Sequence, residues 1–321
     1  MNLHTPLNDL LGIRLPIVLA PMGYAGGAAL ASAVSSAGAL GLIGGGYADK
    51  EWVEREWGAA DPAQVGVGFI TWSLRGREEV FEWALARRPR AVFFSFGDPA
   101  AYFPAARAAG AKILCQVQTV ADARRAAALG ADAIVAQGAE AGGHGATRGT
   151  MALVPAVVDA VAPLPVLAAG GIADGRGIAA ALLLGAQGAL VGTRFLATPE
   201  ALIHANAKAR IVAASGDDTL RTRVFDIVRG RDWPREYTGR ALRNAFSARW
   251  HGNEDGLAKA LHAELPKFNA ALAKGDVEHG LIFAGEGLDL FDRELPAARV
   301  VADLADETVA ALRAAANHLR P

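Results

Sequence analysis

The stretch that decides the fold reads Ala133-Ile134-Val135-Ala136-Gln137-Gly138-Ala139-Glu140-Ala141-Gly142-Gly143-His144-Gly145. It joins a short apolar segment to a glycine-rich loop that carries one histidine. Glycine tolerates positive φ and close backbone approach to a flat ligand, and imidazole titrates near neutral pH. A surface turn that happens to hold a histidine is the alternative. The stretch predicts a buried strand followed by a candidate site at His144, provided that the rest of the chain supplies the matching fold.

Similar short apolar segments recur along the first 200 residues. Most of them lack polar alternation, which is typical of a parallel sheet buried on both faces. The eight predicted strands are Ile17–Ala20, Leu40–Ile43, Val65–Ile70, Ala91–Ser95, Lys112–Val117, Ala133–Gln137, Val166–Ala169 and Ala189–Val191.

Alanine-rich amphipathic segments separate these strands, and strand and helix therefore alternate. A glycine closes several of the helices, because the position after a helix often adopts the left-handed conformation. Thr119 and Asp174 are candidate N-caps. The predicted helices include Ala28–Ala37, Arg77–Arg87, Val120–Leu129 and Gly177–Leu184, and the closing glycines are Gly38, Gly110, Gly130 and Gly185.

Eight strand–helix units predict a closed (β/α)₈ TIM barrel, with an open doubly wound sheet as the alternative. Residues 199–289 contain several predicted helices and no convincing strand, which indicates a mainly helical lobe inserted after the eighth strand. Apolar spacing predicts a last helix over Leu295–Leu319 that packs back on the barrel. The expected division is a barrel of residues 1–200 plus 285–321 and a lobe of residues 201–284.

Composition narrows the class of protein. The 321 residues are 52% hydrophobic and only 20% charged, with a net charge of -1, which disfavours nucleic acid and membrane surfaces as partners. Cys115 is the only cysteine and lies in an apolar run, so an inert buried thiol is expected and no disulfide can form within the chain. The start of the chain does not resemble a signal peptide, and we expect a cytoplasmic location.

Two further glycine loops follow the seventh and eighth predicted strands, where TIM barrels often hold a phosphate. The first contains Gly170 and Gly171, and the second contains Gly192 and Thr193. Free backbone amides there can donate hydrogen bonds to phosphate oxygens, and the Thr193 hydroxyl adds a donor. Ordinary turn chemistry is the alternative for either loop alone.

The segment at the end of the first predicted strand and the glycine loops described above together resemble the nitronate monooxygenase family, formerly called 2-nitropropane dioxygenases. The resemblance spans about residues 16–201 and returns near residues 284–287. The segments that carry it are Ala20-Pro21-Met22, Gln137 to His144, Ala169 to Gly177 and Gly192-Thr193-Arg194-Phe195.

The resemblance implies an FMN cofactor and assigns residues to it. The phosphate is expected on Gly170, Gly171, Gly192 and Thr193, and the ring system over Ala20, Pro21 and Met22. Gln116 and Gln137 are expected to reach the pyrimidine edge or the ribityl chain, although each can equally be the polar end of a buried strand. Gly142 and Gly143 complete the expected cofactor-binding set.

The resemblance also implies that His144 is the catalytic residue. It would take the acidic proton beside a nitro group, or orient a nitronate that is already deprotonated. The implied reaction oxidises an alkyl nitronate with O₂ to a carbonyl compound and nitrite, and the redox chemistry belongs to the flavin. A homodimer is compatible with the sequence, which does not fix the oligomeric state.

The chain departs from the family pattern at two places. Gly68 stands in the third strand where many relatives carry asparagine, and Glu286 lies where relatives vary. Tyr24, Trp72 and Arg148 are weaker candidates for the pocket wall, since loop packing or a solvated charge explains each of them. These departures bear on the substrate more than on the cofactor.

Other functions stay open from the sequence. An NAD(P)H-dependent FMN reductase of the quinone or enoyl-acyl-carrier-protein type is the first alternative, and a non-enzymatic barrel that holds a phosphorylated ligand is the second. The other histidines lack the spacing of a zinc site, and no metal is expected. The sequence also lacks a Gly-x-Ser-x-Gly elbow and a phosphate-binding loop ending in Gly-Lys-Ser/Thr, which disfavours a hydrolase or a nucleoside triphosphatase.

Overall fold

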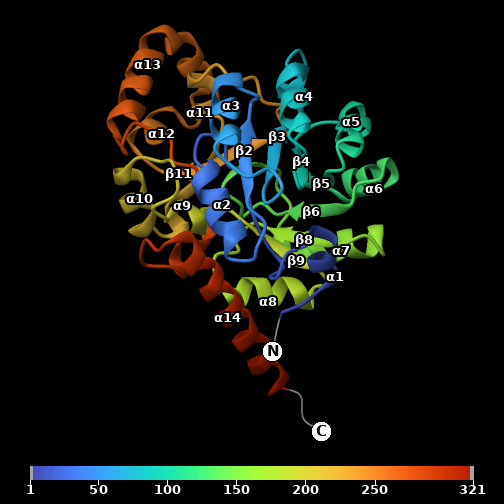
Figure 1. Cartoon of the computed structure of the whole chain (residues 1–321). Helices are drawn as coiled ribbons and strands as arrows, with labels where there is room; N and C mark the ends of the chain where they lie inside the picture. The colour runs from blue at the N-terminus through green and yellow to red at the C-terminus, as the bar shows by residue number, and fades with distance from the viewer. Residues whose placement is uncertain (1–2, 319–321) are drawn as a thin grey trace.

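A computed structural model describes residues 3–318, and its centre is a barrel of eight parallel strands surrounded by helices (Figure 1). The predicted TIM barrel is confirmed. The open sheet is excluded because the first and last strands in the sheet order meet through a parallel bridge between Val18 and Leu40. The barrel strands are β1 (Ile17–Leu19), β2 (Leu42–Gly46), β3 (Gly66–Ile70), β4 (Ala91–Ser95), β5 (Lys112–Val117), β6 (Ala133–Gln137), β8 (Val166–Ala169) and β9 (Gly188–Val191).

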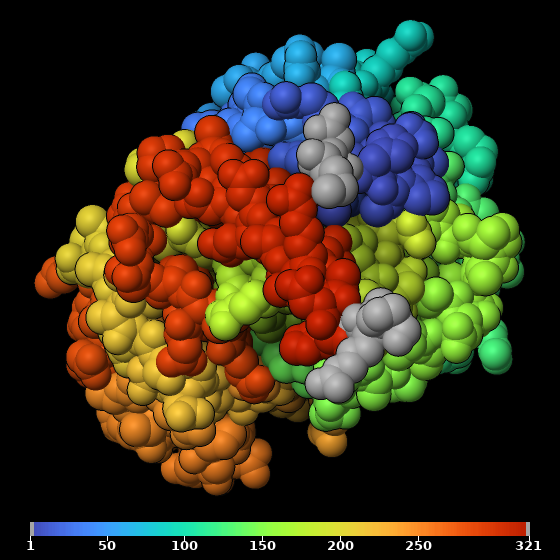
Figure 2. All heavy atoms as spheres, turned by 90° about the horizontal axis from the view of Figure 1, so that it is seen from below, coloured from blue at the N-terminus to red at the C-terminus, as the bar shows by residue number. Residues whose placement is uncertain are grey.

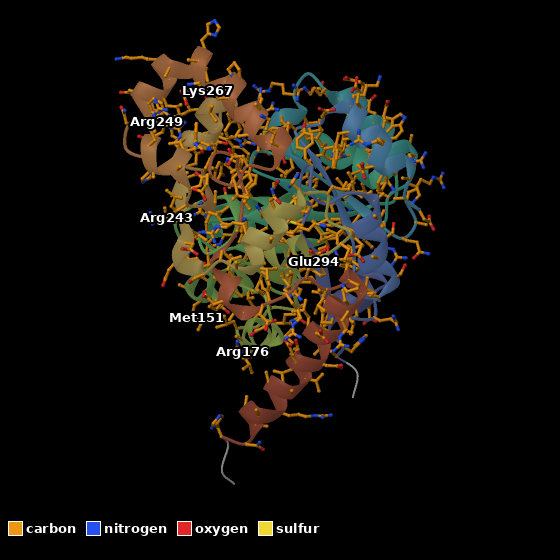
Figure 3. The ribbon with its side chains drawn as sticks, turned by 90° about the vertical axis from the view of Figure 1, so that its left-hand side faces the viewer. Met151, Arg176, Arg243, Arg249, Lys267 and Glu294 are labelled. Carbon is orange, nitrogen blue, oxygen red and sulfur yellow. The ribbon has the colours of Figure 1, made fainter. Side chains whose placement is uncertain are left out.

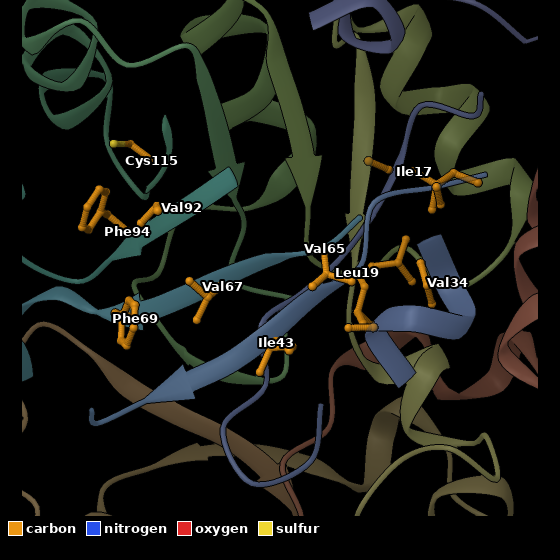
Figure 4. Close-up of a cluster of buried hydrophobic side chains, with 14 of the residues drawn as sticks. Ile17, Leu19, Val34, Ile43, Val65, Val67, Phe69, Val92, Phe94 and Cys115 are labelled. Carbon is orange, nitrogen blue, oxygen red and sulfur yellow. The ribbon is translucent and has the colours of Figure 1, made fainter. Parts of the chain in front are cut away.

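Side chains of each barrel strand alternate between the barrel interior and the surrounding helices. Inward residues such as Val18, Phe93 and Leu167 form one buried cluster, together with Leu7 and Leu11 of helix α1 (Pro6–Leu11). The outward residues form a second cluster against the helices; Figure 4 shows its part around β1 to β5. Because both faces of the sheet are buried, the strands need no polar alternation, as the sequence pattern predicts.

Cys115 belongs to the outward cluster and is 2% exposed. Burial raises the pKa of its thiol to about 12, and the charge of Asp132 adds to this increase. The thiol is therefore protonated at neutral pH, whereas a nucleophilic cysteine must be a thiolate. The structure agrees with the expected inert thiol.

The helices that surround the barrel begin and end near the predicted positions. Thr119 and Asp174 cap their helices by accepting hydrogen bonds from the backbone amides of Asp122 and Gly177. The four predicted closing glycines all have positive φ, between 77° and 101°. The surrounding helices are α2 (Ala28–Ser36), α3 (Lys50–Gly58), α4 (Glu78–Ala86), α5 (Phe103–Ala108), α6 (Val120–Leu129), α7 (Thr150–Val161) and α8 (Gly175–Leu183).

The chain after β9 begins with the short helix α9 (Thr193–Leu196) and continues into a lobe on one side of the barrel, mainly helical as expected (Figure 1). The labelled side chains of Arg243, Arg249 and Lys267 lie on this lobe (Figure 3). The expectation that residues 199–289 contain no strand is wrong. The lobe consists of α10 (Ala205–Val212), β10 (Thr219–Thr222), α11 (Val224–Val228), β11 (Thr238–Leu242), α12 (Ala245–Trp250) and α13 (Glu254–Lys274).

The two lobe strands form an antiparallel sheet with a third strand, β7 (Gly143–Gly145). Strand β7 lies within the glycine-rich stretch that the sequence presents as a loop. Its His144 is paired in register with Gly239 of β11. This sheet therefore joins the lobe directly to the histidine segment of the barrel.

Helix α14 (Ala297–Ala316) returns the chain to the barrel, as predicted, and packs on α8 and α2. Its predicted end at Leu319 lies outside the described residues. Helices α8 and α14 approach closely, because a side chain at Gly175 would collide with Glu307. The Glu307 carboxylate accepts a hydrogen bond from the Gly175 amide at 2.8 Å. Figure 2 shows the C-terminal segment at the surface between the barrel and the lobe. Within residues 3–318, no helix is both long and apolar enough to cross a membrane.

Candidate active site

A cavity of about 830 Å³ opens at the carboxyl ends of the barrel strands and extends beneath the lobe. Its volume is in the range of cofactor and ligand pockets. All of the residues that the sequence assigned to the cofactor and to catalysis line this one cavity: Ala20, Pro21, Met22, Gln116, Gln137, Gly142, Gly143, His144, Gly170, Gly171, Gly192 and Thr193.

His144 is buried in the cavity wall and is held by a carboxylate from the lobe. Its Nε2 lies 3.0 Å and 2.9 Å from the two carboxylate oxygens of Asp226 in α11. Asp226 is 3% exposed and also accepts a hydrogen bond from Arg229 at 2.8 Å. Because the Nε2 hydrogen is donated to Asp226, the neutral imidazole carries its lone pair on Nδ1.

Aromatic rings fix the plane of the imidazole. The indole of Trp233 stacks on His144 with 3.5 Å between ring centroids and an interplanar angle of 5°. Phe283 contacts the imidazole edge-on at 5.4 Å. A side chain at Gly239 would collide with Phe283, so the glycine in β11 leaves room for this arrangement. The ring of His144 therefore has one well-defined orientation.

Burial lowers the pKa of His144 below its ordinary value, and the hydrogen bond and charge of Asp226 oppose this effect. Desolvation penalises the imidazolium, whereas a neighbouring carboxylate stabilises it. The net direction is downward, which favours the neutral imidazole, the form that can accept a proton.

Arg221 of β10 forms hydrogen bonds to both ends of the segment 139–145, which contains His144. Its guanidinium donates to the carbonyls of Ala139 and Gly145 at distances of 3.0–3.1 Å. Burial lowers the pKa of Arg221 to about 10. Since this value is well above neutrality, the arginine stays charged and makes strong hydrogen bonds to both carbonyls.

The two predicted phosphate loops present four free backbone amides. The amides of Gly170, Gly171, Gly192 and Thr193 have no hydrogen-bond acceptor among residues 3–318. Gly170 and Gly171 have φ values of 102° and 72°, which only glycine adopts readily. Such unpaired amides at the end of a TIM barrel match the donor set that a phosphate monoester requires. These residues therefore fit the phosphate of FMN.

Gly170→Ala tests the phosphate loop. An added Cβ would lie 2.9 Å from the Gly138 carbonyl oxygen, and φ is unfavourable for any L side chain. Strain of about 1–3 kcal/mol should displace the loop and weaken FMN binding by roughly 5- to 150-fold. Fluorescence titration of the apoprotein with FMN measures this change. Gly58→Ala is the control, since a Cβ there meets open space, and equal FMN affinity in the two variants would contradict the assignment.

Comparison with known proteins identifies the family. The family model described as nitronate monooxygenase matches residues 4–60 and 74–307. The chain belongs to the nitronate monooxygenase family. A nitronate monooxygenase of Metarhizium robertsii is 37% identical over alignments that cover 95% of this chain and 94% of that protein.

Two solved structures are similar over nearly their whole length. FabK from Thermotoga maritima has a TM-score of 0.84 at 32% identity, with coverage of 98% of this chain and 99% of FabK. A nitroalkane oxidase from Streptomyces ansochromogenes has a TM-score of 0.79 at 32% identity, with coverage of 96% and 99%. This nitronate monooxygenase homologue is therefore an oxidoreductase with the TIM-barrel fold of its relatives.

The two predicted glutamines play unequal parts in the candidate site. The Gln137 side-chain oxygen accepts hydrogen bonds from Gln116 and Gln118, each at 2.7 Å, and its nitrogen donates to the His144 carbonyl at 3.1 Å. Gln137 thus supports the histidine strand. Gln116 donates one hydrogen bond to Gln137 and is the more available of the two for a ligand.

The departures from the family pattern have structural explanations. A Cβ at Gly68 would lie 2.4 Å from Pro21, so the close packing of Pro21 leaves no space for asparagine there. Glu286 forms an ion pair with Arg240 at 2.7 Å and does not line the cavity. Tyr24 does line the cavity, whereas neither Trp72 nor Arg148 is in its wall.

Asp226, Arg229 and Trp233 were not predicted from the sequence, although they surround His144. One usable signal is the acid in Val224-Phe225-Asp226-Ile227-Val228, since a lone carboxylate among apolar residues implies a buried partner. The sequence does not indicate that the partner is His144, which is 82 residues away.

Proposed function

We propose that this family member is an FMN-dependent nitronate monooxygenase that oxidises alkyl nitronates with O₂ to carbonyl compounds and nitrite. The observation that carries the proposal is the placement of His144, held by Asp226, in the cavity that also presents the four free amides. The named relatives from Metarhizium robertsii and Streptomyces ansochromogenes support the same chemistry.

The residues present fit FMN, and each has a role toward it. Gly170, Gly171, Gly192 and Thr193 would hold the phosphate, and Ala20, Pro21 and Met22 would support the ring system. Gly142, Gly143 and Gln116 would complete the contacts, with Gln137 behind them. When bound, FMN supplies the one-electron oxidation of the nitronate and the transfer of that electron to O₂.

The protein residues handle the proton and the charge of the substrate. Asp226 fixes the imidazole tautomer, so Nδ1 of His144 is the nitrogen that can take a proton from the carbon beside a nitro group. With a nitronate as substrate, the same imidazole orients the anion. The rings of Trp233 and Phe283 cover the imidazole and exclude water from it, which strengthens its interaction with the substrate.

In this proposal, the barrel and the lobe have different functions. The barrel, residues 1–200 plus 285–321, would hold the cofactor. The lobe, residues 201–284, would complete the site by supplying Asp226 and Trp233 to a histidine of the barrel.

Anaerobic mixing of the purified flavoprotein with separate reductants tests the function. Ethyl or propyl nitronate should bleach the flavin absorbance rapidly, and admission of O₂ should then yield nitrite and aldehyde. Rapid bleaching by NADH or NADPH, with none by the nitronates, would identify a reductase instead. Protein that binds no flavin and gains no activity with added FMN would favour a non-enzymatic barrel.

A further inference from the structure

Trp233, which stacks on His144, lies in a part of the lobe without regular secondary structure. Residues 229–237 join α11 to β11 and belong to no helix or strand. The indole is nevertheless only 1% exposed, and its Nε1 has one hydrogen-bond partner among residues 3–318, the Tyr47 hydroxyl at 2.9 Å. Because Tyr47 belongs to the barrel, contacts between the barrel and the lobe hold this indole in place.

Three aromatic rings of the barrel contact the Trp233 indole. Tyr47, Trp72 and Phe96 follow β2, β3 and β4, respectively, and we call them the aromatic cradle. Their ring centroids lie 6.2, 5.4 and 5.0 Å from that of Trp233, and all three pairs are edge-to-face, with interplanar angles of 79–81°. Such pairs contribute stability beyond the apolar area that they bury. The barrel therefore provides a shaped seat for a ring that comes from the lobe.

The backbone of the aromatic cradle adopts unfavourable conformations. Phe96 has a φ of 57°, and Ala48, which follows Tyr47, has a φ of 55°. Residues with a side chain rarely adopt this region, and such strain persists only where surrounding contacts impose it. Hydrogen bonds within the barrel supply these contacts, because Arg77 donates to the Tyr47 carbonyl, and the Trp72 amide donates to the Phe96 carbonyl at 3.1 Å. The barrel thus fixes the cradle through its own contacts.

We propose that Tyr47 is a positioning residue for His144. Its hydroxyl accepts the Nε1 hydrogen of Trp233 and keeps the indole stacked on the imidazole, with 3.5 Å between ring centroids. Without this hydroxyl, the buried indole N–H has no acceptor, which makes the stacked arrangement costly. The indole then leaves the imidazole, and the imidazole loses its fixed orientation. This inference rests on the proposed function, which gives His144 its catalytic role.

Tyr47→Phe tests the proposal by steady-state kinetics, because it removes the hydroxyl and keeps the ring. With nitroethane or ethyl nitronate, whichever the wild type oxidises faster, kcat should fall at least about 5-fold, since a buried donor is left unpaired. The affinity for FMN should stay at the wild-type value. Tyr102→Phe is the matched control, because Tyr102 is a half-buried tyrosine of the barrel outside the cavity. Wild-type kcat in Tyr47→Phe would overturn the proposal.

Double-mutant cycles show whether Tyr47 acts through Trp233 and His144. In a His144→Ala background, Tyr47→Phe should cause no further loss of kcat, because no imidazole remains to be positioned. In a Trp233→Phe background, it should also cause no further loss, because the indole N–H is absent. A loss as large as that in the wild-type background, in either cycle, would show that Tyr47 acts independently of these residues and would overturn the proposal.

Proton NMR of the FMN-loaded protein measures the placement of the imidazole without turnover. The ring current of a stacked indole shifts the Cε1 proton signal of His144 upfield, and His144→Ala identifies this signal among those of the seven histidines. Tyr47→Phe should move it downfield, and Tyr102→Phe should leave it in place. If the wild type oxidises neither nitroethane nor ethyl nitronate but the signal moves, the proposed function fails and the positioning role stands. An identical signal in the wild type and in Tyr47→Phe would overturn the proposal whatever the reaction.

Discussion

His144→Ala is expected to retain bound FMN and to lose turnover of neutral nitroalkanes by about 10²- to 10⁴-fold, the usual contribution of a general base. The FMN contacts proposed above do not include the imidazole ring. The loss should be much smaller for preformed nitronates, because these have already given up the proton that the imidazole accepts. Steady-state rates of nitrite release from nitroethane and from ethyl nitronate measure both effects.

The comparison between the two substrates also decides which role His144 plays. Equal losses for nitroethane and ethyl nitronate would show that the imidazole orients the anion and does not remove the proton. His262→Ala is the control, since His262 is an exposed histidine of α13 outside the cavity. Unchanged turnover of both substrates in His144→Ala would remove this residue from the mechanism.

Asp226→Asn is expected to lower the plateau rate on the order of 100-fold and to move the acid limb of the pH profile to lower pH. The rate falls because the imidazole loses the partner that fixes its tautomer and orientation. The limb moves because the carboxylate raises the pKa of His144 against the larger effect of burial. Without that charge, the pKa of the imidazole falls further, and the neutral base persists in more acidic solution.

The direction of this pH shift tests the role of Asp226. A base must be neutral, so activity holds above the pKa of His144 and is lost as the pH falls through it. The profile of kcat/KM against pH for nitroethane measures the position of the limb. Asp232→Asn is the control, because Asp232 is an exposed acid of the same segment. A limb that moves to higher pH, or does not move, would contradict the role given to Asp226.

The barrel was predictable because its signals are local. Each strand from Ile17 to Val191 is a short apolar run, and each closing glycine follows its own helix. The position of a residue after a barrel strand then fixes its place at the carboxyl rim. For this reason, the predicted residues from Ala20 to Thr193 could be brought to one cavity without any knowledge of long-range contacts.

The lobe was less predictable because its structure depends on contacts between distant segments. Strands β10 and β11 have only four and five residues and contain arginine and threonine. They pair with each other, and β11 also pairs with β7, which lies more than 70 residues earlier. The partner of His144 depends on that pairing. No periodicity in residues 199–289 indicates that Asp226 faces His144, because this contact joins segments that are 82 residues apart.

A crystal structure of the protein with FMN bound tests the central claim most directly. We predict that the phosphate oxygens lie about 3 Å from the amide nitrogens of Gly170, Gly171, Gly192 and Thr193, and that the flavin ring faces His144 from the Ala20–Met22 side of the cavity. A phosphate held elsewhere, or a ring that the lobe separates from His144, would contradict the account.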